Sequence, residues 1–195
     1  MRCKWATHHQ LEQDYHDKEW GVPVYDDTKL FEMLTLEGAQ AGLSWLTVLK
    51  KRENYACLFS EFDVESVSTY HEDTIQDILK NPGIIRNKLK VNSVVCNAKQ
   101  ILKVQEEFGS FANYIWSFVD YKPIQNGFKT HEEISADTKI SKQMSRDLKK
   151  RGFKFVGATI CYAFMQAAGL VNDHTTDCFR HDTVKAIGEK EIVLK

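Results

Sequence analysis

The stretch KISKQMSRDLKKRGFKFVGATICYAFMQAA, residues 139–168, decides the fold. Its first part is basic, because residues 139–155 carry seven Lys and Arg residues against one acid, Asp147. Residues 153–168 are apolar on nearly every helical face, which is typical of a helix buried in a protein core. A basic helix, the short turn GFKFVGA (152–158) and a buried helix together indicate a helix–hairpin–helix arrangement.

The turn between these two helices has a possible binding role. It would leave backbone N–H groups at a helix N-terminus facing outward, where they bind a phosphate without reading base sequence. The cations around the turn are Lys149, Lys150, Arg151 and Lys154. On these residues alone an ordinary helix–helix connection with a solvated basic face is an equal alternative.

Helical periodicity runs through the rest of the chain, and no alternating strand pattern of useful length interrupts it. We expect helices near residues 8–18, 27–38, 44–55, 64–69, 71–80, 84–107, 110–118, 131–134, 139–151, 157–168 and 174–178. The candidate N-caps are Asp27, Ser44, Asp63 and Ser110. The predicted fold class is all-α.

Length and composition favour one globular domain over residues 1–180, with two lobes that share a core as the alternative. Residues 181–195 form a polar C-terminal tail whose order the sequence does not decide. No apolar run approaches a membrane span and the start has no signal-peptide core, so we expect a cytoplasmic protein without a membrane partner. A net charge of −1 argues against a general polyanion binder, although one basic face can hold phosphates locally.

Five cysteines are an odd number, and the chain is too long to need disulfides, so free thiols or a metal site are expected. Cys3 and His16 lie near the start of the chain, and HTTDC places His174 and Cys178 four residues apart near its end. Two thiolates and two imidazoles are the usual ligands of a closed tetrahedral zinc site. Such a site would join the two ends of the chain. The alternative is a set of unrelated core cysteines and surface histidines.

The stretch LEGAQAGLSW (36–45) places an acid, Glu37, on the same helical face as Leu30, Leu34 and Ala41. Desolvation there would raise the pKa of Glu37 unless the carboxyl is hydrogen-bonded or faces a cation. The structural alternative is a carboxylate bonded to backbone N–H groups.

Four aromatic residues lie close to this acid in the sequence: Trp5, Tyr15, Trp20 and Trp45. Aromatic side chains are usually core residues. Beside a carboxylate they have a second use, because their faces stack on a flat heterocycle while the acid accepts hydrogen bonds from its exocyclic amine.

Three long segments and the terminal Cys/His pairs closely resemble the type I 3-methyladenine DNA glycosylases. The segments are YHDKEWGVPVYDDTKLFEMLTLEGAQAGLSWLTVLKKRENY (15–55), GIIRNKLKV (83–91) and KKRGFKFVGATICYAFMQAAGLVNDH (149–174). The resemblance runs from Cys3 to Cys178. It implies a helix–hairpin–helix glycosylase fold around a base-binding cleft, with a structural Zn²⁺ that joins the terminal segments. It also implies a base-excision-repair enzyme that releases free 3-methyladenine from alkylated double-stranded DNA, acting as a monomer.

The resemblance assigns roles to individual positions. The implied zinc ligands are Cys3, His16, His174 and Cys178. Base recognition falls on Glu37, Tyr15 and Trp45, with Trp5 and Trp20 as further pocket aromatics. The segment that wedges toward DNA is GLS (42–44), with Gly42 and Leu43 facing the duplex. The hairpin residues are Phe153, Lys154, Phe155, Val156 and Gly157.

The expected reaction follows from the leaving group, since methylation at N3 makes adenine cationic and weakens the glycosidic bond. The enzyme would flip the base, hold it at Glu37 and let water attack the sugar. Whether Glu37 is catalytic or only selects the base stays open. Asn172 stands where many relatives carry a catalytic Asp, so support of His174 is the simpler role for Asp173. No lysine stands where bifunctional relatives carry their nucleophile, which predicts no lyase step. The rival functions are a zinc-stabilised DNA-binding module and a glycosylase for another lesion such as 3-methylguanine.

Overall fold

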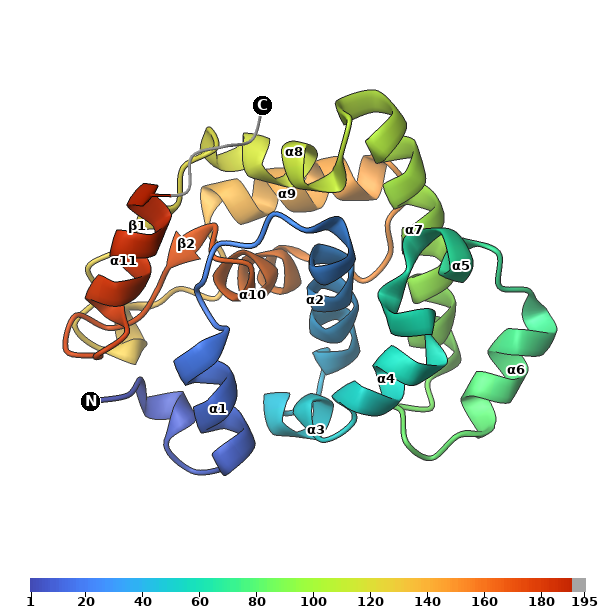
Figure 1. Ribbon diagram of the computed structural model, residues 1–195, viewed down its shortest axis with the longest axis horizontal. Helices are drawn as coiled ribbons and strands as arrows, with labels where there is room; N and C mark the ends of the chain where they lie inside the picture. Colours follow the sequence, from blue (N-terminus) through green and yellow to red (C-terminus); the bar gives the residue numbers. More distant parts are fainter. Residues whose placement is uncertain (191–195) are drawn as a thin grey trace.

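Helices form most of the computed structural model, which describes residues 1–190 (Figure 1). The α-helices are α1 (Gln10–Lys18), α2 (Asp27–Gln40), α3 (Trp45–Leu49), α4 (Arg52–Leu58), α5 (Val64–Ser68), α6 (Glu72–Lys80), α7 (Lys88–Phe108), α8 (Phe111–Trp116), α9 (Lys139–Lys150), α10 (Ala158–Ala167) and α11 (His181–Lys190). Short 3₁₀ helices are η1 (Lys4–Ala6), η2 (Ser60–Phe62), η3 (Ser117–Val119) and η4 (His131–Glu133). Two short strands, β1 (Ile124–Gln125) and β2 (Val171–Asn172), pair in parallel.

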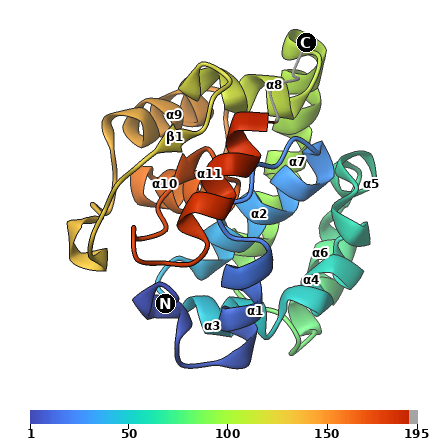
Figure 2. The same ribbon diagram turned by 60° about the vertical axis from the view of Figure 1, so that its left-hand side comes forward.

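The helices α2 and α10 pack against each other at the centre of the molecule. In Figure 1, α8 and α9 lie above them, α4, α5 and α6 lie to the right, and α1 and α11 lie to the left. Figure 2 shows α11 crossing in front of α10 near the N-terminal segment. The buried apolar side chains form one cluster that extends from Cys3 to Cys178. The mostly helical fold expected from the periodicity is confirmed.

Three of the four expected N-caps are confirmed, because Ser44, Asp63 and Ser110 each accept the N–H three residues on. The fourth is wrong by one residue. Asp26 has extended backbone angles and caps α2, whereas Asp27 is already helical. The Asp27 carboxylate instead accepts the N–H groups of residues 111 and 112 and so caps the start of α8.

Several element boundaries differ from the sequence-based expectation. Residues 44–55 form two helices, α3 and α4. Residues 181–190, expected as a polar tail, form α11, and residues 191–195 lie outside the described residues. The helix expected at 174–178 is wrong. Thr176 N–H bonds to Phe128 O, and Cys178 N–H makes a turn bond to Thr175 O, so the chain turns there without forming an α-helix.

Close backbone packing holds the end of α1 against the end of α10. Gly21 N–H donates to Gln166 O, and Val24 N–H donates to Ala168 O. Gly169 has a φ of +73° and lies directly against the backbone of Val22 and Pro23, where any Cβ would clash. This approach brings the aromatic residues of the N-terminal segment beside α10. Within residues 1–190, no helix has the length and apolar character needed to cross a membrane.

Candidate functional site

A cavity of about 230 Å³ opens between the N-terminal segment, α2, α3 and α10. The five residues expected to bind a base all line it: Trp5, Tyr15, Trp20, Glu37 and Trp45. They come from η1, α1, the segment after α1, α2 and α3. The structure therefore brings together side chains that are up to 40 residues apart in the sequence.

Glu37 is 5% exposed, and its carboxyl makes no hydrogen bond to any of the residues 1–190. Burial raises its pKa to about 8. The carboxyl oxygens of Glu37 are not completely sealed from solvent. Because Glu37 lines the cavity, the exposed part of the carboxyl faces the cavity. The alternative of a carboxylate bonded to backbone N–H groups is not what the structure shows.

Aromatic rings form the walls around this acid. The ring centroids of Tyr15 and Trp45 are 5.1 Å apart, and those of Trp5 and Trp20 are 5.2 Å apart. Burial raises the pKa of Tyr15, and the neighbouring Glu37 raises it further, so the phenol stays neutral. The indole N–H of Trp45 is sealed from solvent and has no hydrogen-bond partner among residues 1–190. A flat heterocycle in the cavity would meet aromatic faces and one carboxyl.

The turn after α2 borders the same hollow. We call residues 41–44 the wedge turn. Gly42 has a φ of +77°, Leu43 is 42% exposed, and Ser44 caps α3. A second cavity beside the first is lined by both Glu37 and Leu43, together with Thr159 at the start of α10. The segment expected to face DNA is thus continuous with the pocket.

The α9–α10 turn, residues 153–157, divides into inward and outward residues. Phe153 and Val156 are buried, so only their backbone is available to a phosphate. Lys154 is exposed, and Phe155 adopts a positive φ of 54°. Gly157 precedes α10 without a side-chain cap, which leaves the first N–H groups of the helix without intrahelical partners.

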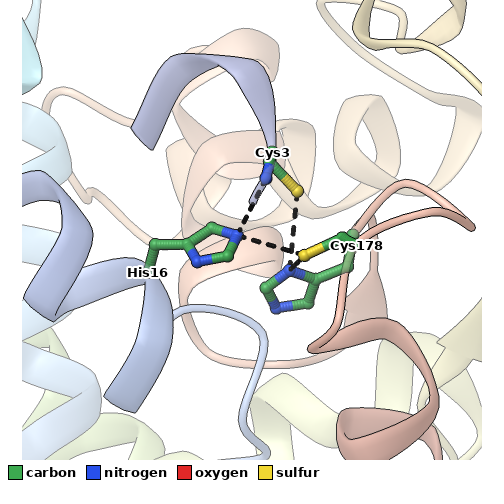
Figure 3. A group of neighbouring side chains, drawn as sticks. Cys3, His16 and Cys178 are labelled. Carbon is green, nitrogen blue, oxygen red and sulfur yellow. Dashed lines mark hydrogen bonds between the residues drawn. The ribbon is translucent and has the colours of Figure 1, made fainter. Parts of the chain in front are cut away.

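Cys3, His16, His174 and Cys178 form one buried cluster whose ligand atoms lie within 4.8 Å of one another. The Cys178 Sγ atom is 3.4 Å from His16 Nε2 and 3.5 Å from His174 Nδ1, and Cys3 Sγ is 3.6 Å from the same Nδ1. Figure 3 shows the two sulfurs and the two ring nitrogens converging on one point. Their arrangement can hold a metal ion.

Each histidine of the cluster is oriented through its other ring nitrogen. His174 Nε2 donates to Trp20 O at 3.0 Å, and His16 Nδ1 donates to the Asp17 carboxylate at 2.8 Å. Arg2 forms a bidentate ion pair with the same carboxylate. These bonds direct His174 Nδ1 and His16 Nε2 toward the two sulfurs, and His16 Nε2 also accepts the Cys3 backbone N–H at 3.3 Å. A hydrogen bond from Cys3 lowers the pKa of the Cys178 thiol, and the two rings lower it further.

Asp173 does not support His174, contrary to the sequence-based expectation. Its buried carboxylate accepts hydrogen bonds from Asn126, Tyr162 and Gln166 instead. Gln166 in turn lines the cavity, so Asp173 orients a wall of the pocket.

The other lining residues were missed by sequence reasoning: Glu12, Gln40, His131, Ala163 and Gln166. Gln40 carries a usable signal because it lies three residues after Glu37 on the same helix. His131 carries none, since a long connection places it at the cavity.

Comparison with known proteins gives one consistent result. The sequence model of the methyladenine glycosylase family matches residues 5–181. DNA-3-methyladenine glycosylase 1 of Escherichia coli (strain K12) is 49% identical over 177 residues, which cover 91% of this chain and 95% of that protein. The DNA-3-methyladenine glycosylase of Haemophilus influenzae is 48% identical over 91% of this chain and 96% of its own length.

Solved structures agree with this result. A crystal structure of 3-methyladenine DNA glycosylase I has a TM-score of 0.91 at 50% identity, covering 93% of this chain and 100% of that one. A structure that describes 3-methyladenine recognition by 3-methyladenine DNA glycosylase I from Staphylococcus aureus has a TM-score of 0.90 at 36% identity, covering 92% and 96%.

Proposed function

This chain belongs to the methyladenine glycosylase family, and from that membership we propose that it is a base-excision-repair glycosylase that hydrolyses N3-methyladenine from alkylated double-stranded DNA and releases the free base. The observation that carries the proposal is Glu37, a desolvated carboxyl that faces an aromatic-walled cavity and has no hydrogen-bond partner among residues 1–190. A DNA-binding module has no need of such a pocket.

Base selection rests on the charge and the hydrogen-bonding groups of the pocket. A cationic base that enters favours the ionised form of Glu37, because an opposite charge lowers the pKa that burial raised. The carboxylate then accepts hydrogen bonds from the adenine amine or a ring N–H. Trp45 stacks on the base and Tyr15 packs along its edge. Trp5 and Trp20 complete the walls.

The bond cleavage needs little assistance from the protein. When the bond between the sugar C1′ and the base breaks, the electron pair moves to the base and cancels its positive charge. Water adds to C1′ and loses a proton. Glu37 contacts the base itself, and its negative charge stabilises the cation both before and during departure, so its main effect is to choose which base is held.

The reaction is proposed to stop at base release. A lyase step needs an amine nucleophile beside the sugar, and none of the residues that line the cavity is a lysine. The wedge turn, with Gly42 and Leu43, would fill the gap left by the flipped nucleotide. The backbone of residues 153–157 and the side chain of Lys154 would bind a DNA phosphate as a helix–hairpin–helix motif.

The Cys3, His16, His174 and Cys178 cluster fits a structural Zn²⁺. Zn–S bonds near 2.3 Å and Zn–N bonds near 2.05 Å at the tetrahedral angle place sulfur and nitrogen about 3.6 Å apart. The three S···N distances of 3.4, 3.5 and 3.6 Å agree with this geometry. The ion would join the N-terminal segment to the chain after β2, leaving no open coordination position for catalysis.

We further propose that the protein acts on DNA inside the cell and that it does so as a monomer, as the resemblance implies. The pocket, the wedge turn and the α9–α10 turn all come from one chain, which supports this.

The deciding experiment is chromatography of the free bases released from methylated duplex DNA. We expect 3-methyladenine to appear, with unmethylated duplex as the control. If the protein releases no base, the proposed glycosylase activity is wrong and the alternative function, a DNA-binding module, is favoured. Release of 3-methylguanine at a higher rate than 3-methyladenine would instead assign the pocket to that lesion.

A further inference from the structure

Helix α7 touches both segments that are proposed to meet DNA, through two buried polar side chains. Lys90 and Asn97 are 8% and 4% exposed. They are seven residues apart, so they lie two turns apart on the same face of the helix. Neither side chain lines the base pocket. Direct recognition of the base therefore does not account for these two buried polar side chains.

The Lys90 ammonium holds the end of α2. Its Nζ donates to Ala39 O at 2.8 Å and to Ala41 O at 2.6 Å. These carbonyls belong to the last turn of α2, where the helix leaves acceptors without partners and carries the negative end of its dipole. The bonds fix the first residue of the wedge turn, and a hydrogen bond from Leu43 N–H to Gln40 O closes that turn. Two of the three N–H donors of the Lys90 ammonium are used in these bonds.

Asn97 holds the α9–α10 turn in the same manner. Its Oδ1 accepts Lys154 N–H at 2.8 Å, and its Nδ2 donates to Lys154 O at 3.0 Å. Both backbone groups of one turn residue are thus bonded to one side chain. The next residue, Phe155, has a φ of +54°, a conformation that the surrounding structure must hold in place for a residue other than glycine.

The two held segments also touch each other directly. A Cβ placed on Gly38 would lie 3.3 Å from the Phe155 Cβ, so the α9–α10 turn rests against α2 one residue from Glu37. Helix α7, the end of α2 and the α9–α10 turn therefore form a closed set of contacts. A change at one of them alters the spacing of the other two.

We propose that Lys90 and Asn97 are positioning residues that set the spacing between the wedge turn and the α9–α10 turn, so that both segments can meet one duplex while the base occupies the pocket. This inference rests on the proposed function. It assigns the two residues to DNA engagement and not to recognition of the base, because their side chains bond to backbone groups at the end of α2, at the wedge turn and at the α9–α10 turn and do not line the pocket. The spacing matters since misplacement by about 1 Å costs about a hundredfold in an enzymatic rate.

The test compares Lys90→Met and Asn97→Ala in the full-length, metal-loaded protein. Two quantities are measured for each variant: the Kd for free 3-methyladenine by tryptophan fluorescence, and kcat/KM for base release from a methylated duplex. We expect kcat/KM to fall about tenfold to a hundredfold, while the Kd of the free base changes by no more than about twofold. Loss of both in parallel, or of neither, overturns the proposal.

Matched controls on the same helix separate positioning from loss of charge or of an amide. Lys88→Met removes an exposed lysine that pairs with Glu72, and Asn92→Ala removes an amide bonded only to Lys88 O within α7. The Lys90→Met defect should exceed the Lys88→Met defect by about tenfold, and equal defects would overturn the proposal. If Lys90→Met does not fold, the pair Asn97→Ala and Asn92→Ala decides alone.

A double-mutant cycle gives a readout that a merely structural role would not move. If Lys90 and Asn97 set one spacing, replacing either residue is enough to disturb that spacing. The kcat/KM of the double variant should then be no lower than that of the less active single variant. Independent, multiplicative defects would overturn the proposal. A wild-type protein that released no methylated base would instead contradict the proposed function itself.

Discussion

Replacing Glu37 by glutamine tests whether its desolvated carboxyl is the group that recognises the base in the pocket. The amide keeps the shape of the side chain and carries no titratable proton. The pKa of Glu37 lies at 4.5 in an ordinary environment and is raised by burial to about 8 in the folded protein. Between pH 4.5 and about pH 8, the carboxyl of Glu37 is ionised in the unfolded chain and still protonated in the folded protein. The wild type therefore loses stability as the pH rises from 4.5 to 8, whereas the variant does not.

The magnitude follows from the two pKa values, which differ by about 3.5. At 1.36 kcal/mol per pKa unit, the full effect is about 5 kcal/mol above pH 8, and about 3 kcal/mol of it is present at pH 7. Both values are upper bounds, since water in the open cavity screens part of the charge. Activity should move the other way. Hydrogen bonds to charged groups contribute about 1.5–3 kcal/mol, so excision should fall about tenfold to a hundredfold.

The stability prediction is checked by urea unfolding of the wild type and of Glu37→Gln at pH 5, 7 and 8.5. The activity prediction is checked by measuring base excision on the same samples. The stability advantage of the variant should grow with pH. Glu12→Gln is the matched control, because it removes an acid from the same cavity where the side chain is only half-buried. A variant that is no more stable than the wild type at pH 8.5 would refute the reasoning. So would a variant that unfolds, since Glu37 would then be structural.

Three further predictions concern the metal, the fold and the reaction. Cys178→Ser should lose the bound zinc in metal analysis, while Cys57→Ser, which removes an exposed thiol, should keep one zinc per chain; full zinc in the first variant would remove Cys178 from the site. Gly169→Ala should lower the free energy of unfolding by about 3 kcal/mol or more, because a Cβ there meets backbone at a positive φ, whereas Gly127→Ala enters open space; equal urea midpoints would contradict this. Borohydride added during base release should trap no protein–DNA adduct, and a trapped adduct would show an amine nucleophile and a lyase step.

The elements that the sequence predicts well are those whose signals are local. Ser44, Asp63 and Ser110 cap helices three residues ahead, and residues 139–168 show a basic helix and a buried helix within one short segment. The predicted cap of α2 is wrong by one position because two adjacent aspartates, Asp26 and Asp27, lie at the start of the helix, and only the backbone angles show which one is the cap.

The wrong prediction at 174–178 has a long-range cause. Thr176 N–H bonds to Phe128 O, and Phe179 N–H, directly after the predicted helix, bonds to Met1 O, while Cys178 N–H makes a local turn bond to Thr175 O. The spacing of His174 and Cys178 suggested a helix, but the cluster forms on a turn all the same. The spacing of two candidate ligands in the sequence indicates that their side chains can meet. It does not determine whether the backbone between them is a helix or a turn.

The cavity around Glu37 was predictable in part, because the sequence places an acid where an apolar residue is expected. Glu37 on an apolar helix face is costly to bury, and a costly feature points to a use. The same reasoning cannot find Gln166, since a glutamine on a buried helix is not unusual in itself. Its place becomes clear only when Asp173, after β2, is seen to hold its amide.

The metal cluster and the base pocket share a wall. Trp20 lines the pocket with its ring, while its carbonyl accepts the hydrogen bond that orients His174 and the two rings lie 4.6 Å apart. Gly21 lies beside the same histidine, where a Cβ would approach the ring to 3.1 Å. Trp5, another wall of the pocket, follows the candidate ligand Cys3 by two residues, and its ring lies 5.5 Å from the ring of His16.

A bound ion would therefore affect base selection without taking part in the reaction. The helices α2 and α10 pack against each other, and backbone hydrogen bonds hold the segment after α1 to the end of α10, whereas η1 directly follows Cys3 of the cluster. Loss of the ion should therefore release the wall formed by Trp5 before it disturbs the walls formed by Trp20 and Glu37. The carboxyl would then face a wider, wetter opening, and water there would lower its pKa and weaken its preference for a cationic ring.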